Sequence, residues 1–272
     1  MERKVVFLDV DGTMINSDGI IPESAREAVQ KAKENGHKMV VCSGRSLFQV
    51  PQKLLDLGFS GVVGAAGALV IADGKEIFHA HIDEEHRKSV TEYLEKNKFV
   101  FCFQTDDGVV ISEENREKML DIMQEQGITQ EHLEQLVGKF YIQDDVWNND
   151  REEKIIYYKA PYPADQVHAD LEPYFDAVQL SLSGADEYSG EIGINGIHKA
   201  TGMEIYLKHV GVSRENCIAI GDGPNDLQMM EYAGIGVAMG NARDDVKERA
   251  DMVTTDINED GIYRAFEQLG LL

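Results

Sequence analysis

Two aspartates separated by one residue, Asp9 and Asp11, follow an apolar run and are followed at once by Gly12 and Thr13. The run from Lys4 to Leu8 predicts a buried strand, and a strand interior cannot hold two ionised carboxylates without compensation. We therefore expect both acids at the carboxyl end of the strand, where open parallel sheets bind ligands. Neighbouring carboxylates repel each other, and a divalent cation with oxygen ligands relieves that repulsion. The segment predicts a Mg²⁺ site.

Asp9 and Asp11 also allow other interpretations. A calcium-binding EF-hand loop needs a glycine at its sixth position and a glutamate at its twelfth. Counted from Asp9, those positions hold Met14 and Ile20, which excludes an EF-hand. An ordinary strand-to-turn Asp-Gly pair remains open on this segment alone.

Two further segments have the residue types that hold a phosphate group. Ser43 and Gly44 follow a predicted strand, His37 to Cys42, and open a helix, where a hydroxyl and exposed amides can bind phosphate oxygens. Lys199 lies at the start of a predicted helix, where the helix dipole disfavours a cation unless an anion compensates it. A lysine point charge suits a transferring phosphoryl group. Each segment alone also fits an ordinary helix start.

The run Gly221 to Asp226 is more specific. It places two carboxylates, an amide and two glycines in one turn after a buried strand. Pro224 and Asp226 have a structural explanation in the first turn of a helix, but Asp222 is left without one. The run therefore points to a second source of metal or phosphate ligands.

Composition limits the class of partner. The chain has 272 residues with 49 acidic and 26 basic side chains, a net charge of −23. This balance opposes nucleic acid and anionic membranes, which bind basic patches, but allows a small anionic substrate. The sequence has no signal-peptide core and no apolar stretch near ~20 residues. We expect a cytoplasmic protein whose three cysteines, Cys42, Cys102 and Cys217, are buried free thiols.

Helix and strand patterns alternate in the first and last parts of the chain. Leu47 to Leu57 is predicted as a helix, and a hairpin is expected around Asp73-Gly74. The alternation predicts an α/β fold, with a Rossmann-like, mostly parallel sheet and helices on both faces. About a hundred intervening residues, including a predicted strand from Ala177 to Leu182, are too many for a loop. We expect a catalytic core from 1–82 and 189–272, with an inserted α/β cap from 83–188.

The order of these motifs resembles the haloacid dehalogenase superfamily of phosphohydrolases. The resemblance rests on Asp-x-Asp-Gly-Thr, Ser-Gly-Arg, the lysine, and Gly-Asp-Gly-Pro-Asn-Asp. The segments Gly236 to Ala242 and Glu259 to Gly261 are similar to its Cof-like branch, which carries an α/β cap where this chain has its insertion. The chain departs from the family pattern at Ser43, usually threonine, at Ala200, usually glycine, and at Ala66, usually asparagine.

The resemblance implies a mechanism and a set of ligands. Asp9 would attack phosphorus and form an aspartyl-phosphate, while Asp11 would protonate the leaving oxygen and then deprotonate water. Mg²⁺ would be bound by Asp9, the backbone carbonyl of Asp11, and Asp222. Asp226 would support the metal or the lysine. Phosphate oxygens would be held by the Val10 amide, Ser43, Gly44, Lys199 and Asn225.

We therefore expect a Mg²⁺-dependent phosphatase that acts on a small phosphorylated metabolite, such as a sugar phosphate. A phosphomutase would use the same aspartyl-phosphate and is the nearest enzymatic alternative. A non-catalytic sensor of a phosphometabolite is the other. No nucleic-acid or membrane partner is expected, and the protein is expected to be a monomer or a small homo-oligomer.

Overall fold

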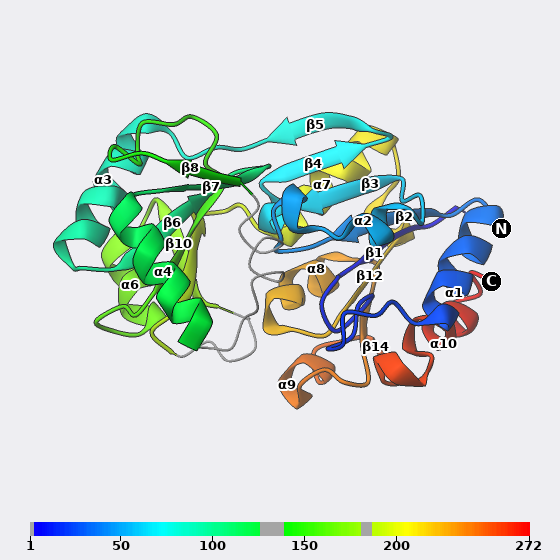
Figure 1. Cartoon of the computed structure of the whole chain (residues 1–272). Helices are drawn as coiled ribbons and strands as arrows, with labels where there is room; N and C mark the ends of the chain where they lie inside the picture. Colours follow the sequence, from blue (N-terminus) through cyan, green and yellow to red (C-terminus); the bar gives the residue numbers. More distant parts are fainter. Residues whose placement is uncertain (1–2, 126–138, 181–186) are drawn as a thin grey trace. The chain divides into compact units, whose positions relative to one another are not determined.

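The computed structural model describes residues 3–125, 139–180 and 187–272, which form two compact units (Figure 1). The first, here called the core unit, comprises Met1–Gly44, Val50–His79 and His198–Leu272. The second, the cap unit, comprises Arg45–Gln49 and Ala80–Ile197. The chain thus crosses between the units four times, whereas a single inserted cap would require only two crossings.

An eight-stranded sheet forms the centre of the core unit. Its strands run parallel from β14 to β3, and β4 and β5 complete one edge as an antiparallel hairpin. From edge to edge the order is β14 (Met252–Val253), β13 (Ile235–Ala238), β12 (Cys217–Gly221), β1 (Val5–Leu8), β2 (Lys38–Cys42), β3 (Gly61–Gly64), β4 (Leu69–Ala72) and β5 (Lys75–His79).

Helices cover both faces of this sheet, which confirms the predicted fold class. Val5 and Phe7 of β1 pack with Met203 and Tyr206 of α7 and with α8 on one face. Because side chains alternate along a strand, the other face receives Val6 and Leu8. On that side α1 contacts β2 and lies beside α10 (Figure 1). The helices are α1 (Glu23–Glu34), α2 (Gln52–Leu55), α7 (Lys199–Val210), α8 (Leu227–Tyr232), α9 (Asp244–Lys247) and α10 (Gly261–Gln268).

The predicted helix from Leu47 to Leu57 is wrong. A 3₁₀ turn (Leu47–Gln49) and the short helix α2 replace it, with Pro51 between them. Proline has no amide hydrogen to donate and disfavours a helical conformation in the residue before it, so a continuous helix cannot form. The two pieces also belong to different units.

A six-stranded sheet forms the cap unit. Helices α3 and α6 pack on one face through a cluster that includes Phe103 and Tyr157, and α4 packs on the other with Cys102 and Ile156. The strand order is β10 (Phe175–Gln179), β11 (Gly190–Ile194), β9 (Lys154–Tyr158), β6 (Val100–Gln104), β7 (Gly108–Ile111) and β8 (Lys139–Ile142). The helices are α3 (Glu84–Lys96), α4 (Glu113–Glu125) and α6 (Ala164–Leu171).

The boundaries between the units differ from the expected ones at 82/83 and 188/189. Ile82 packs in the cap cluster, and β11 pairs with β10 and β9, so 80–82 and 189–197 belong to the cap unit. The strand expected from Ala177 to Leu182 is β10, which begins earlier, at Phe175. The last two residues of the expected range, 181 and 182, lie outside the described residues.

The short segment Arg45–Gln49 is tied to the rest of the cap unit by two hydrogen bonds. The Ser46 hydroxyl donates to Glu153 Oε2 at 2.6 Å, and the Phe48 amide donates to the Asp106 carbonyl at 3.1 Å. Phe48 also packs against the cluster beneath α4. The residue that follows Gly44 is therefore already part of the cap unit.

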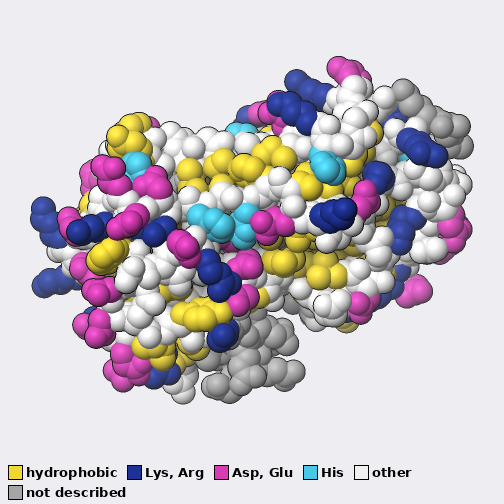
Figure 2. All heavy atoms as spheres, turned by 90° about the horizontal axis from the view of Figure 1, so that it is seen from above, with side chains coloured by type: hydrophobic (Ala, Val, Ile, Leu, Met, Phe, Trp, Pro, Cys, Tyr) yellow, Lys and Arg dark blue, Asp and Glu magenta, His cyan; other side chains and the backbone are white. Residues whose placement is uncertain are grey.

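The surface carries both signs of charge. On the face seen in Figure 2, basic side chains lie among acidic ones and form no continuous patch within the described residues. No helix in the described part of the chain is long and apolar enough to span a membrane. All three cysteines are buried free thiols, as predicted.

Candidate active site

The two aspartates of the first motif take different positions at the end of β1. The Asp9 amide donates to the Ile220 carbonyl at 3.0 Å, which continues the parallel pairing with β12 and leaves the Asp9 side chain buried. Beyond it the chain turns sharply, because the Ile15 amide donates back to the Val10 carbonyl at 2.8 Å. Asp11 lies on this turn and is exposed. Asp9 is thus fixed in the protein, whereas Asp11 faces outward.

Lys199 joins two acids in the interior of the core unit. It is the first residue of α7, and its side chain is only 2% exposed. Its Nζ donates to Asp9 Oδ1 at 2.6 Å and to Asp226 Oδ1 at 2.5 Å. Burial would lower the pKa of the Lys199 ammonium, but the charges of Asp226 and Asp9 raise it above its usual value. Lys199 therefore stays charged beside Asp9.

Asp226 supports the turn as well as the lysine. Its second oxygen, Oδ2, accepts the backbone amides of Asp222 at 3.0 Å and Gly223 at 2.9 Å. These bonds fix the turn that follows β12 and hold Asp222 at the end of that strand. Asp226 thus contacts both Lys199 and the turn that carries Asp222.

Asp222 is held from the other side by the loop after β1. The Thr13 hydroxyl donates to Asp222 Oδ1 at 3.2 Å. Gly12 has a φ of +80°, and a Cβ atom there would lie 2.2 Å from Asp222 Oδ2. Only glycine fits this close approach in that conformation. The Gly12-Thr13 backbone thus forms a wall against which the Asp222 carboxylate rests.

Asp9, Asp222 and Asp226 form an acidic cluster whose ligand oxygens lie within 4.8 Å of one another. Burial, and then the Asp226 charge, raise the pKa of Asp222 to about 7. Burial and Asp226 also raise the pKa of Asp9, against the lowering effect of Lys199. When all three carboxylates are ionised, they share one ammonium group, and two negative charges lack compensation. Hard oxygen donors with surplus negative charge fit a divalent cation such as Mg²⁺.

The remaining predicted residues lie in the same unit. Ser43 is buried after β2, and its amide donates to the Val63 carbonyl at 2.8 Å. The Asn225 amide nitrogen lies 4.0 Å from the position of a Cβ on Gly44, so these two predicted phosphate-binding residues adjoin. The contact of the Thr13 hydroxyl with Asp222 could not be predicted from the residue pattern. It shows only in the folded chain, because the partner lies 209 positions away.

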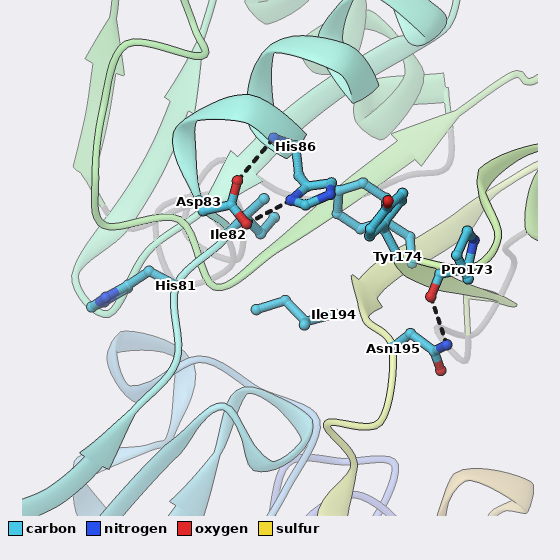
Figure 3. Close-up of a pocket in the computed structure, with 9 residues that line it drawn as sticks. His81, Ile82, Asp83, His86, Pro173, Tyr174, Ile194 and Asn195 are labelled. Carbon is cyan, nitrogen blue, oxygen red and sulfur yellow. Dashed lines mark hydrogen bonds and ion pairs between the residues drawn. The ribbon is translucent and has the colours of Figure 1, made fainter.

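A separate cavity of about 250 Å³ lies within the cap unit (Figure 3). Its lining includes His86, whose ring lies 4.1 Å from that of Tyr174 between centroids, and whose Nδ1 pairs with Asp83 at 2.5 Å. His81 points away from this group in Figure 3. The cavity has none of the charged groups of the core cluster, and we assign it no part in the chemistry.

Comparisons with known proteins identify the family of this chain. Residues 6–266 match the family model described as haloacid dehalogenase-like hydrolase. The chain is 32% identical over 272 residues to the putative phosphatase YkrA of Bacillus subtilis, and the match covers 100% of both chains. It is 28% identical over 272 residues to the 5-amino-6-(5-phospho-D-ribitylamino)uracil phosphatase YcsE of the same species, covering 97% of this chain and 95% of YcsE.

Solved structures share this fold. BT1666 of Bacteroides thetaiotaomicron, described among the phosphatases of this superfamily, is 25% identical with a TM-score of 0.82, and the match covers 99% of this chain and 96% of BT1666. A match that spans almost the whole sequence, with a relative above 30% identity over its full length, establishes the family. The chain belongs to the Cof-like branch of the haloacid dehalogenase-like hydrolases and is a phosphatase of that type.

Proposed function

We propose that this protein is a Mg²⁺-dependent phosphohydrolase that removes phosphate from a small metabolite through an aspartyl-phosphate on Asp9. The observation that carries the proposal is the position of Asp9, buried beside the Lys199 ammonium and within 4.8 Å of Asp222 and Asp226. Purely structural acids would not need this excess of buried negative charge at the edge of a sheet.

In the first step, an Asp9 carboxylate oxygen attacks phosphorus and the bond from phosphorus to the leaving oxygen breaks. Asp11, exposed two residues away, gives its proton to that oxygen. In the second step, Asp11 takes a proton from water as the water oxygen attacks phosphorus. Inorganic phosphate leaves, and the Asp9 carboxylate is restored.

The other residues hold charge in place during these steps. Lys199 compensates the negative charge of the phosphoryl group and of Asp9. The Val10 amide, Ser43, Gly44 and Asn225 are proposed to bind phosphate oxygens. Mg²⁺, when held by Asp9, the Asp11 carbonyl and Asp222, supplies further positive charge to the phosphoryl oxygens.

The substrate class is a small phosphate monoester. Relatives named as 5-amino-6-(5-phospho-D-ribitylamino)uracil phosphatases include YcsE and YitU of Bacillus subtilis, which are 28% and 29% identical to this chain. These names support the phosphate ester of a sugar or polyol chain as the group that the active site accepts. The remainder of the substrate is left open.

The test is a screen of phosphorylated metabolites with Mg²⁺, using the wild type and Asp9→Asn. We expect the variant to lose turnover by on the order of 10⁴-fold, because the amide is a poor nucleophile. Asp18→Asn makes the same change at an exposed site of the same loop and should keep full activity. Undiminished turnover by Asp9→Asn would refute the assigned nucleophile.

Product analysis in the same screen separates the two alternatives. Transfer of phosphate to another position of the substrate, faster than phosphate release, would identify a phosphomutase. Saturable binding of a phosphometabolite by the wild type without turnover would identify a sensor.

A further inference from the structure

The turn that follows β13 carries an asparagine that reaches into the loop of the first aspartates. Asn241 Nδ2 donates to the Gly12 carbonyl at 2.8 Å. Its Oδ1 accepts the Ile257 amide at 3.0 Å, so the side chain spans two backbone segments. The resemblance to the Cof-like branch covers this turn but gives Asn241 no role.

The turn itself is firmly placed. The Met239 amide donates to the Gly221 carbonyl at 2.9 Å, at the end of β12. The Gly240 amide donates to the Thr255 carbonyl at 2.9 Å, and a Cβ on Gly240 would lie 2.3 Å from the Asp256 nitrogen. Asn241 therefore extends from a closely packed base rather than from a free loop.

The bond to Gly12 bears directly on Asp222. The Gly12 carbonyl belongs to the peptide group that joins Gly12 to Thr13, and both residues contact the Asp222 carboxylate. Because this peptide joins the two residues, holding it in place positions both the Thr13 hydroxyl and the Gly12 backbone beside Asp222. A shift of the peptide would let the Asp222 carboxylate rotate away from Asp9.

We infer that Asn241 is a positioning residue, which holds the Gly12-Thr13 peptide against Asp222 and so preorganises the acidic cluster for a divalent cation. This inference rests on the proposed function. Groups that orient metal ligands contribute about 10- to 100-fold to metal affinity in proteins. Asn241 does not itself touch metal or substrate in this account.

A neighbouring asparagine supplies a matched control. Asn16 Nδ2 donates to Asn258 Oδ1 at 2.8 Å, which joins the same two chain regions at an exposed position away from Gly12. Asn258→Ala removes one hydrogen bond between these regions and leaves the Gly12-Thr13 peptide held, whereas Asn241→Ala removes the bond to Gly12 and also frees the Ile257 amide. Comparison of Asn241→Ala with Asn258→Ala therefore distinguishes the positioning of Asp222 from the general attachment of the loop.

The experiment measures metal binding directly and by activity. Mg²⁺ is titrated by calorimetry into the wild type, Asn241→Ala, Asn241→Ser and Asn258→Ala, and the Mg²⁺ concentration for half-maximal turnover is measured alongside. We expect both Asn241 variants to bind Mg²⁺ about 10-fold more weakly, with kcat at saturating Mg²⁺ changed much less. Asn258→Ala should bind as the wild type does.

The outcomes are distinguishable from failure of the proposed function. A wild type that binds no Mg²⁺ would overturn the proposed function itself. A wild type that binds Mg²⁺, with Asn241→Ala and Asn241→Ser binding equally well, would overturn only the role of Asn241. Equal weakening in Asn258→Ala would also overturn it, since loop attachment alone would then explain the effect.

Discussion

At the scale of single residues, Lys199 is buried between two acids in the core unit. Its side chain is 2% exposed, and its partners Asp9 and Asp226 are 8% and 1% exposed. An ammonium group so placed costs much desolvation energy, which its two ion pairs offset. The same arrangement that neutralises the lysine also brings the nucleophile candidate and its supporting acid into contact.

Removing the charge of Lys199 alone should destabilise the protein more than removing it together with the charge of one of its acidic partners. We expect Lys199→Met to lower the free energy of unfolding by about 3–5 kcal/mol, because it leaves Asp9 and Asp226 as buried acids without a counter-charge. The double variant Lys199→Met with Asp226→Asn should lose less than the sum of the two single changes. Urea unfolding of the four proteins measures this. Strict additivity would show that the residues do not act as a unit.

At the scale of elements, another buried acid lies just before β9 in the cap unit. Glu152 is fully buried, and within the described residues neither carboxylate oxygen accepts a hydrogen bond. Arg87 of α3 is 3.4 Å away, but it donates its own hydrogen bonds to the carbonyls of Ile82 and Trp147. Burial raises the pKa of Glu152 to about 7. The ionised form is therefore unfavourable in the folded state.

This acid gives the cap unit a pH dependence of known sign. The folded pKa lies above the unfolded value, so the contribution of Glu152 to stability is full below that value and is lost as pH rises through about 7. Glu152→Gln should gain stability relative to the wild type between pH 5 and pH 8, by up to about 3 kcal/mol. Urea unfolding of both proteins across this range measures the difference. A difference that stays constant with pH would contradict the explanation.

Elements with strong periodicity could be predicted from the sequence, and those that depend on distant partners could not. The helical spacing of the buried alanines in α1 and the apolar run of β1 can be recognised in the sequence without knowledge of distant contacts. By contrast β11, Gly-Glu-Ile-Gly-Ile, has two glycines and forms a strand because β10 and β9 pair with it from both sides. The helix predicted across Pro51 does not form, because proline lacks the amide hydrogen that a continuous helix needs there.

The candidate site shows the same division. Carboxylates and a lysine at the ends of predicted strands and helices are informative before folding, because burying charge needs a reason. The residue types of Thr13 and Asn241 are not informative in this way, because a hydroxyl or amide side chain that forms hydrogen bonds to the backbone occurs at many turns. Their partners, Asp222 and Gly12, are adjacent only once the sheet has formed.

At the scale of the whole molecule, the two units should respond differently to metal. If Mg²⁺ binds the acidic cluster, at 100 times its Kd it would stabilise the core unit by about 2.7 kcal/mol. Amide hydrogen exchange that requires unfolding of the core unit should then slow about 100-fold in β1 and β12, while β6 and β9 of the cap unit change little. Mass spectrometry of exchange with Mg²⁺ or with EDTA measures both. Equal protection in all four strands would show that the units unfold together.

The division of the chain at Gly44 limits how this protein can be re-engineered. Residues 45–49 are encoded among core segments, yet Ser46 and Phe48 bond to cap residues. A chimaera that transplants only 80–197 from a relative would leave these five residues facing foreign neighbours, one bond from Gly44 of the proposed phosphate-binding turn. Recombination libraries should exchange both segments together, and Ser46 with Glu153 should be inherited as a pair.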